Sequence, residues 1–180
     1  MKTLFCVIPL VCLLCFAFGC QDKAAMAELE EFRAQAAVEE QNIELAKNVH
    51  LAWTKKDYEL IRASCAPDMV YYSPSNEKQM DNIDELIEFA EGFLASFPNY
   101  EIRIEESAAK GDVVALRAVV TGIHGGNFMG IPATGNRIEF GQMLFFRVEN
   151  GKIVEMREDF DNLGMMQQLG MELKPKEAGK

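Results

Sequence analysis

Apolar side chains recur at helical spacing in three stretches of the N-terminal half of the chain. Residues 24–54 contain no Pro or Gly, and their large apolar residues are denser in the second half. A second stretch follows Asp57, a residue that suits a helix N-cap, and a third covers residues 83–94. The pattern predicts three helices, the first of which enters the globular unit over residues 41–54.

From Tyr100 onward, the spacing of apolar residues changes from that of a helix to the every-second-residue pattern of a strand. Apolar and charged residues alternate over residues 100–105, so one face of this strand is expected to point inward. Asn150-Gly151 marks a hairpin between the last two strands. Strands are predicted over residues 69–72, 100–105, 113–124, 137–148 and 152–160, with a short helix over 162–169. Helices followed by an antiparallel meander indicate an α+β domain, with helices packed on one face of a strongly bent sheet.

The first 20 residues have the pattern of a secretory signal. Lys2 is their only charge, and it precedes an apolar run over residues 4–18 that is shorter than the ~20 residues needed to cross a membrane. Ala17-Phe18-Gly19 before Cys20 resembles the lipobox of bacterial lipoproteins, although an Ala replaces the usual Leu. We expect cleavage after Gly19, acylation of Cys20 and an extracytoplasmic lipoprotein anchored to a membrane, in the bacterial periplasm or on the outer surface. The alternatives are a soluble secreted protein with a free Cys20 thiol and an uncleaved anchor.

These patterns divide the chain into four parts. Residues 1–19 form the predicted signal, 20–40 the lipidated cysteine and a charged helical tether, 41–172 the folded domain and 173–180 a flexible tail. Outside the signal the cysteines are Cys20 and Cys65, so there is no disulfide framework. Cys65 is expected to be buried as a small hydrophobic residue.

Composition and charge narrow the classes of function. The chain has 180 residues, 49% of them hydrophobic, which suits one domain with its own core. It carries 18 Lys and Arg against 28 Asp and Glu, a net charge of −10, which disfavours binding to nucleic acid. The sequence has no Gly-rich phosphate loop, no Cys/His metal spacing and no G-x-S-x-G elbow. We therefore predict neither a metal nor another cofactor.

Three polar residues on otherwise apolar strands are candidate acids and bases. His124 shares the parity of the apolar residues in its strand and is expected to face the interior, as either a hydrogen-bonded core residue or a catalyst. Asp159 and Asp161 share a parity at the end of the last strand, where burial would raise the pKa of a carboxyl. The alternative for Asp161 is a cap on the helix that follows.

Aromatic residues and one arginine are candidates for the wall of a pocket. An apolar cavity or the core would take the side chains of Trp53, Tyr71, Tyr72, Phe140 and Phe145. The face of Arg147 relative to Asp161 depends on the loop at Asn150-Gly151, because a two-residue loop and a three-residue loop with a bulge give opposite answers. The predicted substrate pocket comprises Trp53, Tyr72, Phe140, Arg147 and Asp159.

Three segments together resemble the SnoaL-like polyketide cyclases, also called ester cyclases. They are residues 121–135, which begin Thr-Gly-Ile-His-Gly-Gly, residues 146–155, which begin Phe-Arg-Val-Glu-Asn-Gly, and residues 161–170, which end Gln-Gln-Leu-Gly. The resemblance runs roughly from Ile43 to Gly170. It implies the nuclear transport factor 2-like fold, a cone in which a curved antiparallel sheet and three helices enclose one pocket.

For characterised members, the resemblance implies a cofactor-free intramolecular aldol cyclisation of a polyketide ester, in which one Asp acts as general acid and base. Asp161 is the matching Asp, and His124 is a neighbouring polar residue of the pocket wall. The resemblance also implies a small apolar substrate and a homodimer. It fails at Met156-Arg157, where members often carry His-Trp, and at Tyr72-Ser73, where they often carry His-Asp.

Two functions from different classes remain. One is an enzyme of the cyclase or isomerase type that uses Asp161 and His124. The other is a non-enzymatic lipoprotein whose pocket binds a small apolar ligand, or whose sheet face serves an assembly. An accessible Asp161 carboxyl at the pocket floor favours the enzyme. A carboxylate held by the backbone N–H of Leu163 or Gly164 favours the structural alternative.

Overall fold

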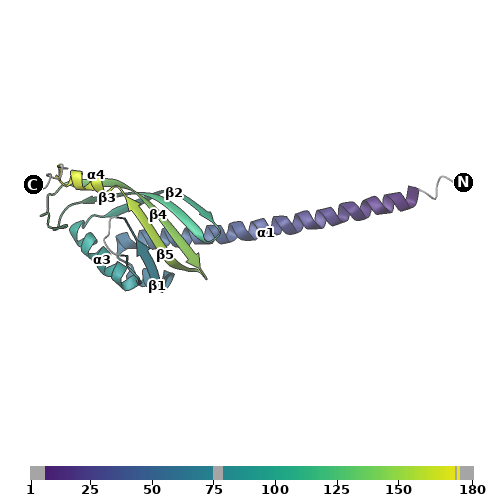
Figure 1. The fold of residues 1–180 in the computed structure, drawn as a ribbon, viewed down its shortest axis with the longest axis horizontal. Coiled ribbons are helices and arrows are strands. Elements are labelled where there is room, and N and C mark those ends of the chain that lie inside the picture. The colour runs from purple at the N-terminus through teal and green to yellow at the C-terminus, as the bar shows by residue number, and fades with distance from the viewer. Residues whose placement is uncertain (1–6, 75–78, 173, 175–180) are drawn as a thin grey trace, which may run out of the picture. The chain divides into compact units, whose positions relative to one another are not determined.

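The computed structural model describes the backbone of residues 7–74, 79–172 and 174, and within these ranges the side chains from residue 23 onward (Figure 1). The chain divides into two compact units between Val38 and Glu39. The first six residues of the predicted signal, the Cys20 side chain and the predicted tail beyond residue 174 lie outside the described part.

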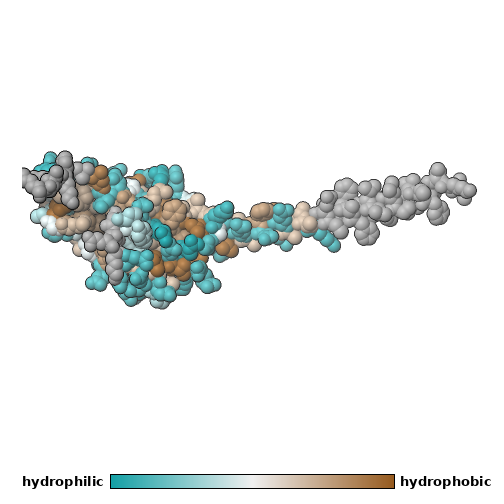
Figure 2. Space-filling model, viewed as in Figure 1, coloured by the Kyte–Doolittle hydropathy of each residue, from teal (hydrophilic) through white to brown (hydrophobic). Residues whose placement is uncertain are grey.

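The first unit is the N-terminal part of one long helix, α1 (Val7–Lys55). The helix continues through the predicted tether because no Pro or Gly interrupts residues 20–55. Every side chain from residue 23 to residue 38 is exposed. Figure 2 shows apolar and polar residues mixed on the visible face of this segment. In the described part of the chain, no helix is long and apolar enough to cross a membrane.

In the second unit, the described strands form one curved sheet in the order β1-β5-β4-β3-β2 (Figure 1). The strands are β1 (Cys65–Tyr72), β2 (Glu101–Lys110), β3 (Val113–Ile123), β4 (Arg137–Glu149) and β5 (Lys152–Phe160). Neighbouring strands are antiparallel except β1 and β5, which are parallel. The α+β class is confirmed, but the sheet is mixed rather than wholly antiparallel. No hairpin joins β1 to β5, so no tight turn imposes opposite directions on them.

The second unit contains the end of α1 and three shorter helices, α2 (Tyr58–Ser64), α3 (Ile83–Ser96) and α4 (Asn162–Gln168). Each of the three shorter helices begins at a side-chain cap. Asp57 accepts a hydrogen bond from the Leu60 N–H at 3.0 Å, which confirms its predicted role as the N-cap of α2. Asn82 accepts one from the Glu85 N–H at 2.9 Å and caps α3. Helix α3 lies beneath the concave side of the sheet (Figure 1).

The main core lies between the inner face of the sheet and the helices α1, α2 and α3. On β4, the side chains at even positions from 138 to 148 are buried, whereas those at odd positions are at least partly exposed. All of the even residues are apolar except Gln142. Cys65 is buried as expected, with 3% of its surface exposed. Gln142, the one polar residue on the inner face of β4, lies where the apolar core ends and the candidate site begins.

The β4–β5 hairpin decides which β5 side chains face inward. Asn150 and Gly151 form a two-residue turn with φ angles of 50° and 72°, the positive values that a type I′ turn requires. Beyond this turn the pairing of β4 with β5 shifts by one residue between Arg147 and Val148, which is a β-bulge. The bulge reverses the alternation along β5. As a result, Glu158 faces inward and Asp159 is exposed on the outer face.

Candidate functional site

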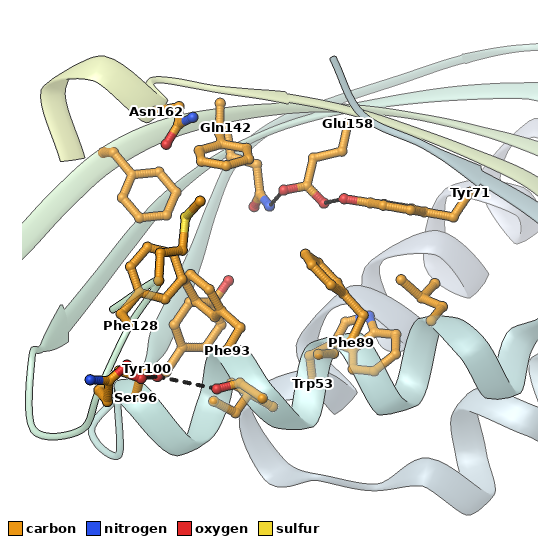
Figure 3. A pocket seen from close by; sticks show the side chains of 18 residues that line it. Trp53, Tyr71, Phe89, Phe93, Ser96, Tyr100, Phe128, Gln142, Glu158 and Asn162 are labelled. Atoms are coloured by element: carbon orange, nitrogen blue, oxygen red, sulfur yellow. Dashed lines mark hydrogen bonds between the residues drawn. The ribbon is translucent and has the colours of Figure 1, made fainter. Parts of the chain in front are cut away.

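A cavity of about 410 Å³ lies between the inner face of the sheet and helix α3 (Figure 3). Its walls come from α1, β1, α3, β4, β5 and the loop around Phe128. Eight of the eighteen residues that line it are aromatic: Trp53, Tyr71, Phe89, Phe93, Tyr100, Phe128, Phe140 and Phe160. An apolar cavity of this volume suits a small organic molecule.

The carboxyl group of Glu158 faces this aromatic cavity and lies between Tyr71 and Gln142 (Figure 3). Its Oε2 atom accepts a hydrogen bond from the Tyr71 hydroxyl at 3.0 Å, and its Oε1 atom accepts one from Gln142 Nε2 at 2.8 Å. Burial raises the pKa of Glu158 above its ordinary value, and the charge of Asp159 adds to this rise, while the two hydrogen bonds oppose it. The carboxyl therefore changes its protonation state closer to neutrality than an exposed Glu does.

Tyr71 and Tyr100 line the same cavity as neutral phenols. Burial raises the pKa of both hydroxyls, and the negative charge of Glu158 raises them further. Tyr71 therefore keeps its proton and remains a donor to Glu158. The Tyr100 ring packs edge-on against Phe93, with 5.5 Å between the ring centres, which fixes its place in the wall.

Strand pairing explains why the three polar groups meet. Across β4 and β5, Leu144 is opposite Glu158 and Gln142 is opposite Phe160, so Gln142 and Glu158 are diagonal neighbours on the inner face. On the other side of β5, Tyr71 of β1 pairs with Met156, two residues before Glu158. Strand β5 thus holds the carboxyl between one donor on each neighbouring strand.

Trp53 and Phe140, both predicted for the substrate pocket, are among the residues that line the cavity. Tyr72 is not, contrary to the prediction. It is 41% exposed on the face of β1 opposite to Tyr71, where the Arg157 guanidinium lies 5.6 Å from its ring centre. Successive residues of a strand point to opposite faces, so only one of the two tyrosines reaches the cavity.

Arg147 and Asp159, also predicted for the pocket, lie on the outer face of the sheet instead. Arg147 forms ion pairs with Asp112 at 2.7 Å and with Glu155 at 3.5 Å. Asp159 is exposed, and neither residue lines the cavity. Arg147 is at an odd position of β4, where side chains are at least partly exposed, and Asp159 faces outward because of the β-bulge in β5.

Asp161 lies outside the cavity lining and caps helix α4. Its Oδ1 atom accepts a hydrogen bond from the Gly164 N–H at 2.8 Å, and its side chain is exposed. This is the helix-cap alternative that the sequence left open.

His124 is fully buried, as its parity predicted, but it also lies outside the cavity lining. Its ring stacks on Phe97 with 5.3 Å between the ring centres. Its Nδ1 atom lies 3.0 Å from Thr134 Oγ1 and accepts a hydrogen bond from the Thr134 N–H at 3.3 Å. These contacts are those of a core histidine, and the structure does not bring His124 and Asp161 together at the cavity.

The sequence reasoning missed Glu158 and Gln142. Gln142 carried a signal, because it is the only polar residue among the even positions that β4 buries. Glu158 carried no such signal. Its side chain points inward because of a β-bulge, and the residues of the turn do not predict that bulge.

The arrangement supports proton transfer. A partly buried carboxyl with a raised pKa is a better general acid or base near neutral pH than an exposed Glu. The neutral tyrosines are hydrogen-bond donors, of the kind that stabilise a carbonyl oxygen as negative charge develops on it. Among the residues that the structure describes, no group of three or more His, Cys, Asp or Glu side chains is placed to hold a metal ion.

The sequence is similar to those of known polyketide cyclases. The family model described as SnoaL-like polyketide cyclase matches residues 43–169. The aklanonic acid methyl ester cyclase DnrD of Streptomyces peucetius is 40% identical over 70 residues, which make up 39% of this chain and 46% of that protein. The matched region therefore spans less than half the length of this curated relative.

Solved structures share the fold. A protein from Jannaschia sp. CCS1, assigned as a SnoaL-like polyketide cyclase, superposes with a TM-score of 0.69 at 26% identity, over 75% of this chain and 95% of that one. AclR from Streptomyces galilaeus, assigned as a hydroxylase, superposes with a TM-score of 0.66 at 30% identity, over 73% of this chain and 97% of that one. The two assigned activities differ, so the reaction has to be argued from the residues of the cavity.

Replacement of Asp161 by Ala is expected to remove the N-cap of α4 and to lower the free energy of unfolding by about 1 kcal/mol. Asp161→Asn is the matched control. It keeps an oxygen at the cap and is expected to change the stability by less than about 0.5 kcal/mol. Urea denaturation of the full chain measures both values. Equal stabilities for Asp161→Ala and the wild-type protein would contradict the capping role.

Proposed function

This chain belongs to the SnoaL-like polyketide cyclase family, and we propose that it catalyses a cofactor-free cyclase or isomerase reaction on a small apolar carbonyl compound. Glu158 is the general base and acid in this proposal. The observation that carries it is a carboxyl group that faces an aromatic cavity and is held there by Tyr71 and Gln142.

The proposed reaction moves one proton and forms one carbon–carbon bond. The Glu158 carboxylate takes a proton from the carbon next to a carbonyl group, which leaves an enolate. The enolate carbon attacks a second carbonyl of the same molecule, and the alkoxide that forms takes the proton back from Glu158. The carboxyl ends as it began, so the cycle consumes no other reactant. In an isomerase reaction, the proton returns instead to another atom of the enolate.

The cavity fits this chemistry in two further respects. Its aromatic lining disfavours water beside an enolate and offers apolar contacts to a folded substrate. Tyr71 and Tyr100 are neutral donors in the same lining, and Tyr100 is placed to donate a hydrogen bond to a substrate oxygen.

The second candidate function is the binding of a small apolar ligand without turnover. Both carboxyl oxygens of Glu158 already accept a hydrogen bond from the protein, which is also what a purely structural buried carboxylate requires. The two candidates differ in whether a bound carbonyl compound loses a proton.

Deuterium exchange into 1-tetralone distinguishes the two candidates. This aryl ketone is apolar, has a proton next to its carbonyl and needs no cofactor to exchange it. The full wild-type chain in D₂O is expected to speed the exchange, measured by mass spectrometry. Glu158→Gln is expected to lower that rate by a factor of about 100 or more, because the amide cannot accept the proton. Asp161→Asn, the control at the helix cap, is expected to exchange like the wild-type protein.

Binding is measured in parallel through fluorescence, because Trp53 is the one tryptophan of the chain and lines the cavity. Saturable quenching by 1-tetralone without any exchange would contradict the enzyme and favour ligand binding. Loss of exchange in Asp161→Asn but not in Glu158→Gln would identify Asp161, and not Glu158, as the general base.

For the N-terminal region we propose a lipoprotein anchored through Cys20. The apolar run and the residues before Cys20 support the anchor, and the exposed helical segment over residues 23–38 supports a spacer between membrane and domain. The homodimer that the family resemblance implies stays a prediction, which sedimentation equilibrium of the full chain tests.

Cys20→Ser is expected to move the protein from the membrane fraction to the soluble fraction of a bacterial host, because the acyl chains would supply the attachment. Cys65→Ser is the matched control and is expected to stay with the membrane. Immunoblots of the two fractions measure the distribution. Membrane attachment that persists in Cys20→Ser would rule out the lipid anchor.

A further inference from the structure

A buried histidine, His50 of helix α1, is next to the polar end of the cavity without lining it. It is 3% exposed, and neither ring nitrogen forms a hydrogen bond with another described residue. Burial lowers its pKa to about 4, so the ring is neutral at physiological pH. A neutral imidazole carries one N–H donor and one acceptor nitrogen.

The side chain that interacts with His50 is Gln142. The interaction partly offsets the effect of burial on the pKa of the imidazole, although the two side chains do not form a hydrogen bond of standard geometry. Gln142 is itself 4% exposed, and its Oε1 atom is buried without a hydrogen bond in the described part of the chain. Its Nε2 atom already donates to Glu158 at 2.8 Å. The free acceptor of Gln142 and an N–H donor of His50 are therefore complementary.

The orientation of the Gln142 amide has a consequence for Glu158. An amide has a donor end and an acceptor end, and a half-turn about its last bond exchanges them. In the turned orientation, the carbonyl oxygen would face the Glu158 carboxylate, and two acceptors would repel each other. Whatever fixes the acceptor end of the amide therefore preserves the hydrogen bond to Glu158.

We propose that His50 is a positioning residue, whose N–H holds the Gln142 amide in the orientation that donates to Glu158. His50 would thereby set how readily the carboxyl takes up a proton. An effect of His50 on catalysis rests on the proposed function of Glu158. The interaction of His50 with Gln142 does not depend on that function.

The other ionisable groups around Glu158 do not explain such an effect of His50. Tyr71 on β1 and Tyr100 before β2 face the carboxyl, and burial keeps both neutral. Asp159, the next residue of β5, is exposed on the outer face and raises the pKa of Glu158 by its charge. Any effect of His50 on the pKa of Glu158 is therefore expected to be transmitted by Gln142.

The test is the titration of the Glu158 carboxyl carbon by ¹³C NMR in the full chain, with the resonance assigned by its loss in Glu158→Gln. The hydrogen bond from Gln142 lowers the pKa of Glu158, so its weakening should raise that pKa. His50→Phe is expected to raise the pKa by up to about one pH unit, since the ring stays but the N–H is lost. Gln142→Leu is expected to raise it at least as far.

The double variant His50→Phe/Gln142→Leu shows whether His50 acts through Gln142. It is expected to titrate like Gln142→Leu alone. His50→Gln and His50→Asn each restore an N–H near the place of one ring nitrogen, and one of the two is expected to return the pKa to the wild-type value. His124→Phe, at the other buried histidine, is the matched control and is expected to leave the Glu158 titration unchanged.

A wild-type titration of Glu158 in His50→Phe would overturn the proposal, and so would a further rise when His50→Phe is added to Gln142→Leu. Should His50→Phe fail to fold, His50→Leu takes its place with the same expected result. The titration needs no substrate. An absence of tetralone exchange would therefore contradict the proposed function alone, and an unmoved titration would contradict the role of His50 alone.

Discussion

A carboxylate cannot remain charged in an apolar cavity without hydrogen-bond donors, and this constraint organises the inner face of the sheet around Glu158. One donor comes from each neighbouring strand, Tyr71 on β1 and Gln142 on β4. The parallel pairing of β1 with β5 brings Tyr71 to the carboxyl, although the two strands are far apart in the chain. The donors lower the pKa of the carboxyl but do not cancel the effect of burial.

Much of the fold follows from local signals in the sequence. The apolar period of α3, the cap at Asp57 and the turn at Asn150-Gly151 are each properties of a few neighbouring residues, and the structure shows all of them. The alternation of β4 is equally local, and it predicted that Phe140 could face a cavity. Elements of this kind need no knowledge of distant contacts.

The site depends instead on long-range pairing, which the sequence does not display. A one-residue bulge in β5 turns Glu158 inward and Asp159 outward, so the parity that Asp159 shares with Asp161 did not predict which carboxyl faces the cavity. The parallel direction of β1 likewise depends on the assembled sheet. Of Glu158 and Gln142, only Gln142 carried a signal in the sequence, as a polar residue in a buried apolar series.

The functional account rests on the buried state of the Glu158 carboxyl, and the pH dependence of stability tests it most directly. A carboxyl whose pKa is raised from 4.5 on folding binds more protons in the folded state than in the unfolded state. Its contribution to stability is therefore fully present below about pH 4.5 and is lost as pH rises through the folded pKa.

Glu158→Gln cannot lose this contribution, and the other titrating groups, His50 included, largely cancel in a comparison with the wild-type chain. The account predicts that the free energy of unfolding of Glu158→Gln, minus that of the wild-type protein, grows as pH rises above about 4.5. It then levels off once the folded carboxyl is ionised. A difference that stays constant across this range, or that falls with rising pH, would contradict a desolvated carboxyl at the cavity.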